Sequence, residues 1–185
     1  MRRIALAVAA MALLAACGQT EDNDTRAPAT PQPNEADVTF TQSMIPHHQQ
    51  AIDMAEAIKT RTTRPELVQL AGAITTTQGA EITRMRQWLQ AWGKPEAMPG
   101  MDHDQTAMPG MMGQDEMDQL MGLKGTQFDL AFVDMMSRHH QGAIQMASTE
   151  LTDGSLPEVK QLAQQIITSQ QREVDQFAAW QRSWA

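Results

Sequence analysis

The chain has 185 residues and a formal net charge of −8 at pH 7, from 22 acidic and 14 basic side chains. This acidic balance argues against nucleic acid as a partner, because phosphate binding needs a basic surface. The only cysteine is Cys17, which excludes an intramolecular disulfide. We therefore expect packing, without cross-links, to stabilise the fold.

Residues 1–16 have the charge order of an export signal. Arg2 and Arg3 precede an apolar run that is shorter than the roughly 20 residues of a membrane-spanning helix. The run ends in Leu14-Ala15-Ala16-Cys17-Gly18, which resembles the bacterial lipoprotein box. The resemblance implies that Cys17 carries a lipid anchor in the membrane, that the protein faces the periplasm, and that Gly18 favours sorting to the outer membrane. An ordinary cleaved signal with an incidental cysteine is the alternative.

Residues 17–36 form a predicted flexible tether. Pro28, Pro31 and Pro33 lie among Thr, Asn, Asp and Glu without apolar periodicity, which is typical of linkers. The remaining residues, 37–185, are enough for one domain with a core of its own.

The domain contains two similar halves, 37–92 and 129–184, which align without a gap. Both contain the pattern Met-x-x-His-His-Gln-x-Ala-Ile-x-Met-Ala, at 44–55 and 136–147. Each half is predicted to form two helices separated by a polar turn, at 60–64 or 152–156. The prolines that follow these turns, Pro65 and Pro157, suit the first turn of a helix.

Apolar side chains recur every three or four residues from Leu67 to Trp88, which predicts an amphipathic helix. No segment alternates with the period of a strand. Two hairpins with one apolar stripe each can cover both stripes by packing together. We therefore predict an all-α fold, an antiparallel four-helix bundle of two duplicated hairpins, at 37–92 and 126–185. The four tryptophans are expected to pack at the helix ends.

Pro46 lies inside the first predicted helix, where its ring should kink the chain just before the histidines. The second half has Arg138 at this position, so we expect the two motifs to differ in affinity. The alternative is a helix that starts near Ser43.

Each repeat brings imidazole and thioether groups to one helical face. Met44 precedes His47 and His48 by three and four residues, a spacing at which its sulfur can approach either ring. The two rings flank a line of small residues, so both can reach the interior. This donor set suits a soft metal ion, copper(I) above all, and predicts one site in each half. The ligand candidates are Met44, His47, His48 and Met54, with Met136, His139, His140 and Met146.

Four polar residues lie on or beside the buried stripes of the second and fourth predicted helices: Gln78, Glu81, Gln170 and Glu173. Because a buried carboxylate without a partner is unfavourable, we expect Glu81 and Glu173 to accept hydrogen bonds from the histidines and to orient their rings. Direct ligation by the carboxylates would favour a harder metal. A polar contact between helices without metal is the third interpretation.

The linker at 93–125 is rich in methionine and contains the repeated string Met-Pro-Gly-Met, which predicts turns, with a short helix at 115–123. Two interpretations remain open. The linker is either a flexible arm that captures copper(I) or silver(I) and passes it on by ligand exchange, or a lid whose methionines cover the bundle end. The candidates for auxiliary metal capture are Met98, Met101, His103, Met108, Met111 and Met112.

The two motifs at 44–55 and 136–147 resemble the bacterial domain of unknown function 305 family, which includes CopM-like periplasmic copper-binding proteins. The resemblance covers about 37–184 and implies a ferritin-like four-helix fold. It also implies copper(I) or silver(I) binding through Met and His, in metal tolerance or delivery.

The predicted function is that of a lipid-anchored protein that sequesters copper(I) or hands it to a transfer partner, without catalytic turnover. One alternative is an iron or manganese di-metal oxidase, in which Glu81, Glu173 and the paired imidazoles would hold two ions. Against it, the Glu-x-x-His spacing of such oxidases does not occur in the sequence. The other alternative is a metal-free structural interaction module.

Overall fold

The computed structural model describes residues 31–97 and 108–184. These ranges form five α-helices and no strand, so the all-α prediction is confirmed for them. The helices are α1 Glu35–Arg61, α2 Pro65–Trp92, α3 Gln114–Gly122, α4 Gly125–Asp153 and α5 Pro157–Trp184. None of the described helices has the length and apolar character needed to cross a membrane. The predicted signal, Cys17, Met98, Met101 and His103 lie outside the described residues.

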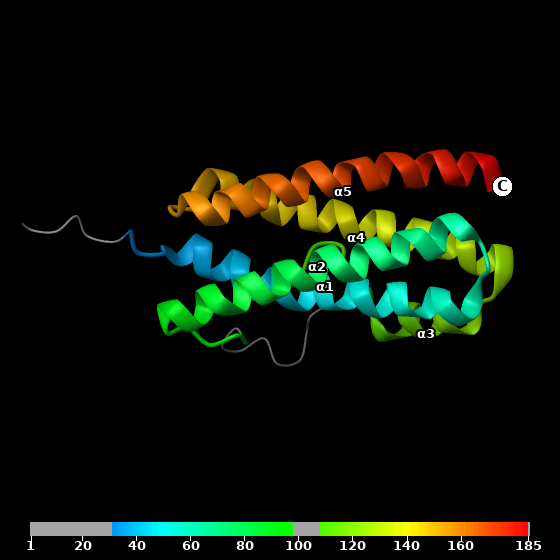
Figure 1. Ribbon diagram of the computed structural model, residues 1–185, viewed down its shortest axis with the longest axis horizontal. Helices are drawn as coiled ribbons and strands as arrows, with labels where there is room; N and C mark the ends of the chain where they lie inside the picture. The colour runs from blue at the N-terminus through cyan, green and yellow to red at the C-terminus, as the bar shows by residue number, and fades with distance from the viewer. Residues whose placement is uncertain (1–30, 98–107, 185) are drawn as a thin grey trace, which may run out of the picture. The chain divides into compact units, whose positions relative to one another are not determined.

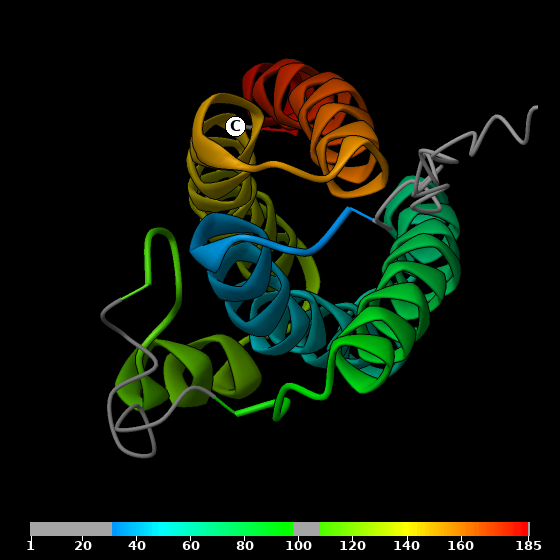
Figure 2. The ribbon, with the colours of Figure 1, turned by 90° about the vertical axis from the view of Figure 1, so that its left-hand side faces the viewer.

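The four long helices form two antiparallel hairpins, α1 with α2 and α4 with α5, and the hairpins pack through α1 and α4 (Figure 1). Figure 2 shows α2 and α5 on one side of the α1–α4 pair and the short α3 on the other. The two helices that carry the repeated histidine motif are therefore the inner helices of the molecule.

The helix boundaries follow local sequence signals. Asn34 caps α1 in a capping box with Asp37, in which each side chain accepts a hydrogen bond from the other residue's backbone N–H, at 2.9 and 2.7 Å. Helix α1 then continues through Pro46, so the alternative of a start near Ser43 is wrong. Pro65 and Pro157 begin α2 and α5, as the sequence predicts.

The core consists of two apolar clusters, one towards each end of the long helices. Cluster 1 contains Met54, Phe128, Phe132, Met136 and Phe177, and cluster 2 contains Phe40, Met44, Met85, Val159 and Ile166, among others. Along each long helix, the residues of one cluster precede those of the other, and buried polar side chains lie between them. These polar side chains are His47, His48, Gln78, His139, His140 and Gln170. The interior therefore has a polar layer at its middle, and each cluster draws on both halves of the chain.

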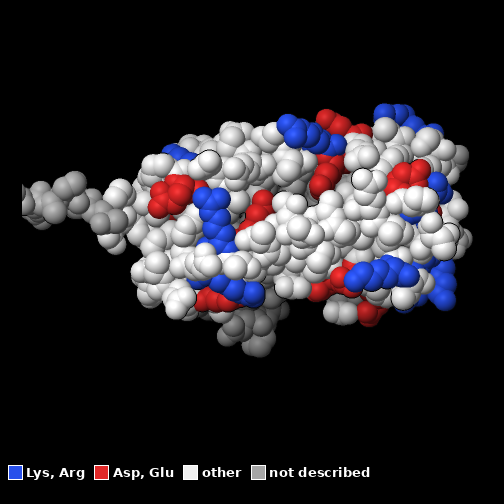
Figure 3. Space-filling view, viewed as in Figure 1, with Lys and Arg blue, Asp and Glu red and all other residues white. Residues whose placement is uncertain are grey.

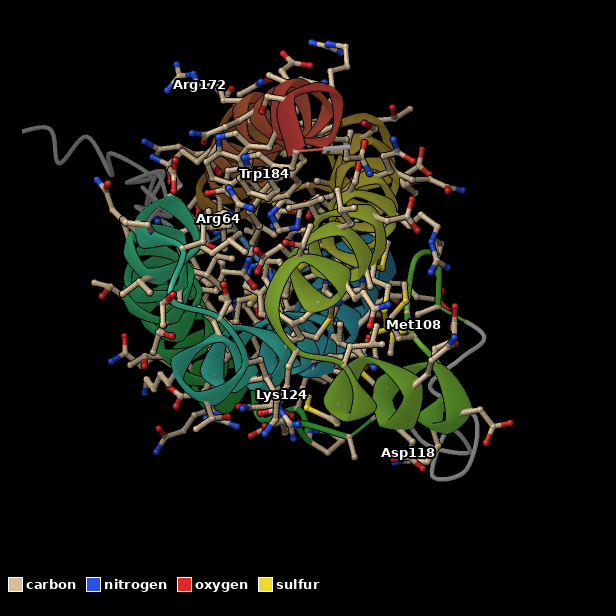
Figure 4. All side chains as sticks on the ribbon, turned by 90° about the vertical axis from the view of Figure 1, so that its right-hand side faces the viewer. Arg64, Met108, Asp118, Lys124, Arg172 and Trp184 are labelled. Atoms are coloured by element: carbon tan, nitrogen blue, oxygen red, sulfur yellow. The ribbon has the colours of Figure 1, made fainter. Side chains whose placement is uncertain are left out.

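The equivalent residues Asp37 and Asp129 tie each inner helix to the turn of the opposite hairpin. Asp37 accepts hydrogen bonds from the backbone N–H groups of Ser155 and Leu156, at 3.1 and 3.0 Å. Asp129 instead accepts from the Arg64 guanidinium, at 2.8 Å. The same guanidinium lies 4.0 Å from the Trp184 ring, and Figure 4 shows the two side chains together on the α2 and α5 side.

The tryptophans stack in pairs, Trp88 on Trp92 and Trp180 on Trp184, and they pack against the ends of the two clusters as expected. Acidic and basic side chains are interspersed over the face drawn in Figure 3, where neither sign forms an extended patch.

The buried carboxyl group of Glu150 predicts how the stability of the fold depends on pH. Burial, with the neighbouring Asp37 carboxylate, raises the pKa of Glu150 to about 8. The folded state therefore binds a proton between pH 4.5 and 8 that the unfolded state releases, so the free energy of unfolding falls as pH rises through this interval. Glu150→Gln removes this titrating group. As pH rises from 5 to 8, the free energy of unfolding of the variant, measured by urea denaturation, should therefore rise by roughly 2 to 4 kcal/mol relative to that of the wild type.

Exposed Glu158 on α5 provides the control. Glu158→Gln should leave the pH dependence of the wild type unchanged. Parallel stability curves for Glu150→Gln and the wild type would contradict the assignment of a proton to Glu150.

Candidate metal centre

The four histidines of the repeated motif meet at the middle of the α1–α4 interface. The ring centroids of His47 and His139 are 3.8 Å apart, and those of His139 and His140 are 6.3 Å apart. All four side chains are almost completely buried. The sequence predicts one site per half, and in the structure the imidazoles of both halves lie together, because antiparallel α1 and α4 contact each other at their motifs.

Two carboxylates close this centre on the side of α2 and α5. His48 donates from Nε2 to Glu81 at 2.7 Å, and His140 donates from Nε2 to Glu173 at 2.5 Å. These are the hydrogen bonds that the sequence predicts. Because a carboxylate only accepts, each Nε2 bears a proton, and Nδ1 of each ring has no hydrogen-bond partner among the described residues.

On the opposite side, a backbone carbonyl orients a third ring. His47 donates from Nε2 to the Pro109 oxygen at 3.1 Å, which leaves the lone pair on Nδ1. Nothing in the sequence pattern predicts this contact, since Pro109 lies in a turn of the linker.

Five buried ring nitrogens have no hydrogen-bond partner among the described residues. They are Nδ1 of His47, His48 and His140, and both nitrogens of His139. Buried polar atoms are almost always partnered, because removing them from water without compensation is unfavourable. One nitrogen of His139 carries a proton, and an ion held by the lone pairs of the others would supply the missing interactions.

Burial also keeps the central rings neutral. Burial and the nearby His48 lower the pKa of His47 to about 3. Burial, together with His47 and the other two rings, lowers the pKa of His139 well below its ordinary value. At neutral pH both rings therefore keep their lone pairs available for a metal ion.

The predicted methionine ligands lie in the two clusters that flank the histidines. Met44 and Met136 are fully buried and lie one helical turn before the histidines of their own helices. Met54 packs in cluster 1 with Met136, while the partly buried Met146 packs against cluster 2, which contains Met44. Each cluster therefore combines thioethers from both repeats.

Sequence reasoning missed Met135, which is buried in cluster 1, four residues before His139. This spacing on an inner helix is the signal that would have found it. The equivalent position in the first half is Ser43, so the two halves differ in sulfur content just before the motif.

Gln78 and Gln170 are buried as expected, but the side-chain oxygen of each has no hydrogen-bond partner within the described ranges. No group of three or more His, Cys, Asp or Glu side chains in residues 31–97 and 108–184 has the arrangement of a preformed metal site.

The described part of the linker covers the centre and not the bundle end. Met108, Met111 and Met112 are at most 8 % exposed, and Figure 4 shows Met108 beside the inner helices, on the side away from α2 and α5. Helix α3 follows and is joined to α4 by the Glu116–Arg138 ion pair at 3.0 Å. A surface groove of about 740 Å³ next to it is lined by Pro46, Met108, Met117 and Met121, among others.

The lowered pKa values of His47 and His139 predict acid sensitivity. Between pH 6.5 and about 3, the unfolded chain binds protons that the folded chain excludes, so stability falls as pH decreases. His47→Gln keeps a donor for Pro109 but removes one titrating ring. Its free energy of unfolding at pH 4 to 6 should depend on pH less steeply than that of the wild type, by about 1.4 kcal/mol per pH unit. Equal slopes for the two proteins would contradict a neutral, buried His47.

Comparison with known proteins supplies an independent line of evidence. The family profile of Domain of unknown function 305 (DUF305) matches residues 37–181. A solved DUF305 protein from Streptomyces coelicolor is 30 % identical, with a TM-score of 0.75, over 80 % of this chain and 93 % of that one. A DUF305 fragment from Deinococcus radiodurans is 31 % identical, with a TM-score of 0.75, over 83 % and 99 %.

The structure of CopM in the Cu(I)-bound form is also similar, at 36 % identity and a TM-score of 0.68, over 80 % of this chain and 96 % of CopM. CopM has been solved with Cu(II) and with silver as well. No curated protein gives a significant match. The extent and identity of these matches show that the chain belongs to the DUF305 family.

Proposed function

We propose that the chain is an envelope protein that binds copper(I), or silver(I) as its chemical analogue, at the centre formed by His47, His48, His139 and His140. The observation that carries the proposal is the set of five partnerless ring nitrogens between two clusters that contain buried thioethers. Met44 and Met136 are the proposed sulfur ligands next to the rings, and Met54 and Met146 lie further along the same helices.

The donor chemistry supports a soft monovalent ion. Neutral imidazole and thioether groups favour copper(I), whereas carboxylate and water favour harder ions. Glu81 and Glu173 hold the Nε2–H groups of His48 and His140, which fixes the ring orientation and makes Nδ1 a better donor. Their negative charge also compensates a cation that enters the buried layer.

The second candidate is a di-metal oxidase with iron or manganese, which the proximity of Glu81 and Glu173 to the rings favours. In the present geometry, however, each carboxylate accepts a hydrogen bond from the protonated Nε2 of its histidine. The lone pairs of these rings lie at Nδ1, away from the carboxylates. This arrangement suits an orienting role for the two glutamates better than a shared hard-metal site.

The wider proposal includes compartment and role. The resemblance of residues 14–18 to a lipoprotein box supports a lipid anchor at Cys17 and a position facing the periplasm, with the outer membrane as the destination. CopM, which is 36 % identical over 80 % of the chain, has been solved with copper and with silver. This likeness supports a ferritin-like four-helix bundle that sequesters metal or delivers it to a transfer partner without turnover.

Anaerobic competition with a copper(I) chelator tests the function. The wild-type protein should withdraw copper(I) from the chelator, and the double variant His47→Leu, His139→Leu should bind at least about 100-fold more weakly, because it removes the two central ligands. Leucine fills much of the space of each ring and adds no polar group, and the one hydrogen bond lost among the described residues is that of His47 to the Pro109 carbonyl, so helicity measured by circular dichroism should persist. Tight iron or manganese binding with oxygen consumption, or an unchanged copper(I) affinity in the variant, would overturn the proposal.

The thioether contribution is tested separately. Met44→Leu with Met136→Leu preserves side-chain volume but removes both sulfurs, so copper(I) affinity should fall by roughly 10- to 100-fold. Met85 on α2 is equally buried and lies outside the motif, so Met85→Leu is the matched control and should bind like the wild type. Equal affinities for all three proteins would show that the ligands are histidines alone.

A further inference from the structure

Residues 108–112, here called the strap, cross the interface of the two inner helices at the histidine centre. The strap forms a tight turn in which the Met111 N–H donates to the Met108 carbonyl at 3.2 Å. Gly110 lies in the middle of this turn with φ of +77°, a conformation that L side chains rarely adopt. The three methionines of the strap are buried although the segment is not helical.

On α4, the strap rests on Gly142. A Cβ atom at position 142 would lie 1.9 Å from the Pro109 oxygen and 2.8 Å from the Gly110 Cα. In the other direction, a Cβ atom at position 110 would lie 2.6 Å from the Arg138 carbonyl oxygen. The backbones of the strap and of α4 therefore approach so closely that both positions require glycine.

On α1, the strap is held by Gln50. The Gln50 side chain accepts a hydrogen bond from the Met112 N–H at 2.8 Å and donates one to the Met112 carbonyl at 2.9 Å. Positions 50 and 142 are equivalent in the two repeats. A single asymmetric segment crosses two related helix surfaces, so the equivalent positions have become different: an amide that holds the strap and a glycine that makes room for it.

The strap also makes the two central rings different. Its Pro109 carbonyl accepts the Nε2–H of His47, and no hydrogen bond joins the strap to the His139 ring. Met112 packs in cluster 1 with Met54 and Met136. Displacement of the strap would therefore free the His47 ring and open the thioether cluster beside it.

We propose that the strap is the retention element of the centre, and that Gly142 and Gln50 are the positioning residues that seat it. A bound soft cation leaves on this side only after the strap has lifted from α1 and α4. This inference rests on the proposed metal binding and adds that the strap sets the rate at which the metal ion leaves the centre.

The test compares Gly142→Ala with Gly79→Ala. Nothing lies within 4 Å of a Cβ atom at position 79, and alanine favours a helix over glycine, so the control should fold and bind like the wild type. In Gly142→Ala, the new methyl group would displace Pro109. Copper(I) release to excess chelator, followed by stopped-flow absorbance, should become at least about tenfold faster in Gly142→Ala and stay unchanged in Gly79→Ala.

A second pair of variants tests the seat on α1. Gln50→Ala should also speed release, whereas Gln49→Ala should not, because Gln49 is exposed and, among the described residues, its side chain bonds to Asp53 in its own helix. Gln50→Ala creates no backbone clash, so it carries the test if Gly142→Ala fails to fold.

A readout without metal separates the two proposals. Nitrogen NMR of the imidazoles in the metal-free protein should show His47 as the Nε2–H tautomer in the wild type and in Gly79→Ala, and mixed tautomers in Gly142→Ala. If the wild type does not bind copper(I), the proposed function fails whatever the tautomer. If copper(I) binds but the release rate is the same in the wild type, Gly142→Ala and Gln50→Ala, the function stands and the retention role of the strap is wrong.

Discussion

The burial of four imidazoles between two apolar clusters is the constraint on which the rest of the structure depends. Burial keeps the central rings His47 and His139 neutral, and each N–H of the four rings must find an acceptor that water no longer provides. Glu81, Glu173 and the Pro109 carbonyl meet this need for three rings. The acceptor nitrogens stay without partners, so the metal-free interior is unfavourable in its central layer. A cation that binds there stabilises the folded state in proportion to its concentration and affinity.

The duplicated sequence produces one centre because of how the halves pack. Helices α1 and α4 run antiparallel with their motifs in contact, so equivalent residues meet near a local twofold axis, as the pair His47 and His139 shows. The equivalent residues Asp37 and Asp129 likewise each bind the turn of the opposite hairpin, one at each end of the α1–α4 pair. The two halves differ at Gln50 and Gly142, the equivalent positions that contact the strap. They also differ at Pro46 and Arg138, of which Arg138 forms an ion pair with Glu116 of α3.

The sequence alone predicts the elements that depend on local pattern. Helical periodicity, the prolines Pro65 and Pro157 and the polar turns define both hairpins, and the unfavourable burial of a carboxylate predicts the contacts of Glu81 and Glu173 with histidine. It could not predict that His47 faces His139, because the partner of a helix and its register are set by tertiary packing. Nor could it place the strap, since residues 108–112 have no periodicity and their seat depends on the absence of a side chain at Gly142.

Because each apolar cluster mixes residues of both hairpins, neither hairpin alone contains a complete core. A solitary hairpin with this sequence would expose its motif and would bury it by pairing with another copy across a twofold axis. A homodimer of such hairpins would have the geometry of the two halves of the present chain. In the present chain the halves are covalently joined, and part of the connection, residues 108–112, lies across the interface of α1 and α4. The connection therefore adds contacts to the centre that two separate, identical hairpins could not supply.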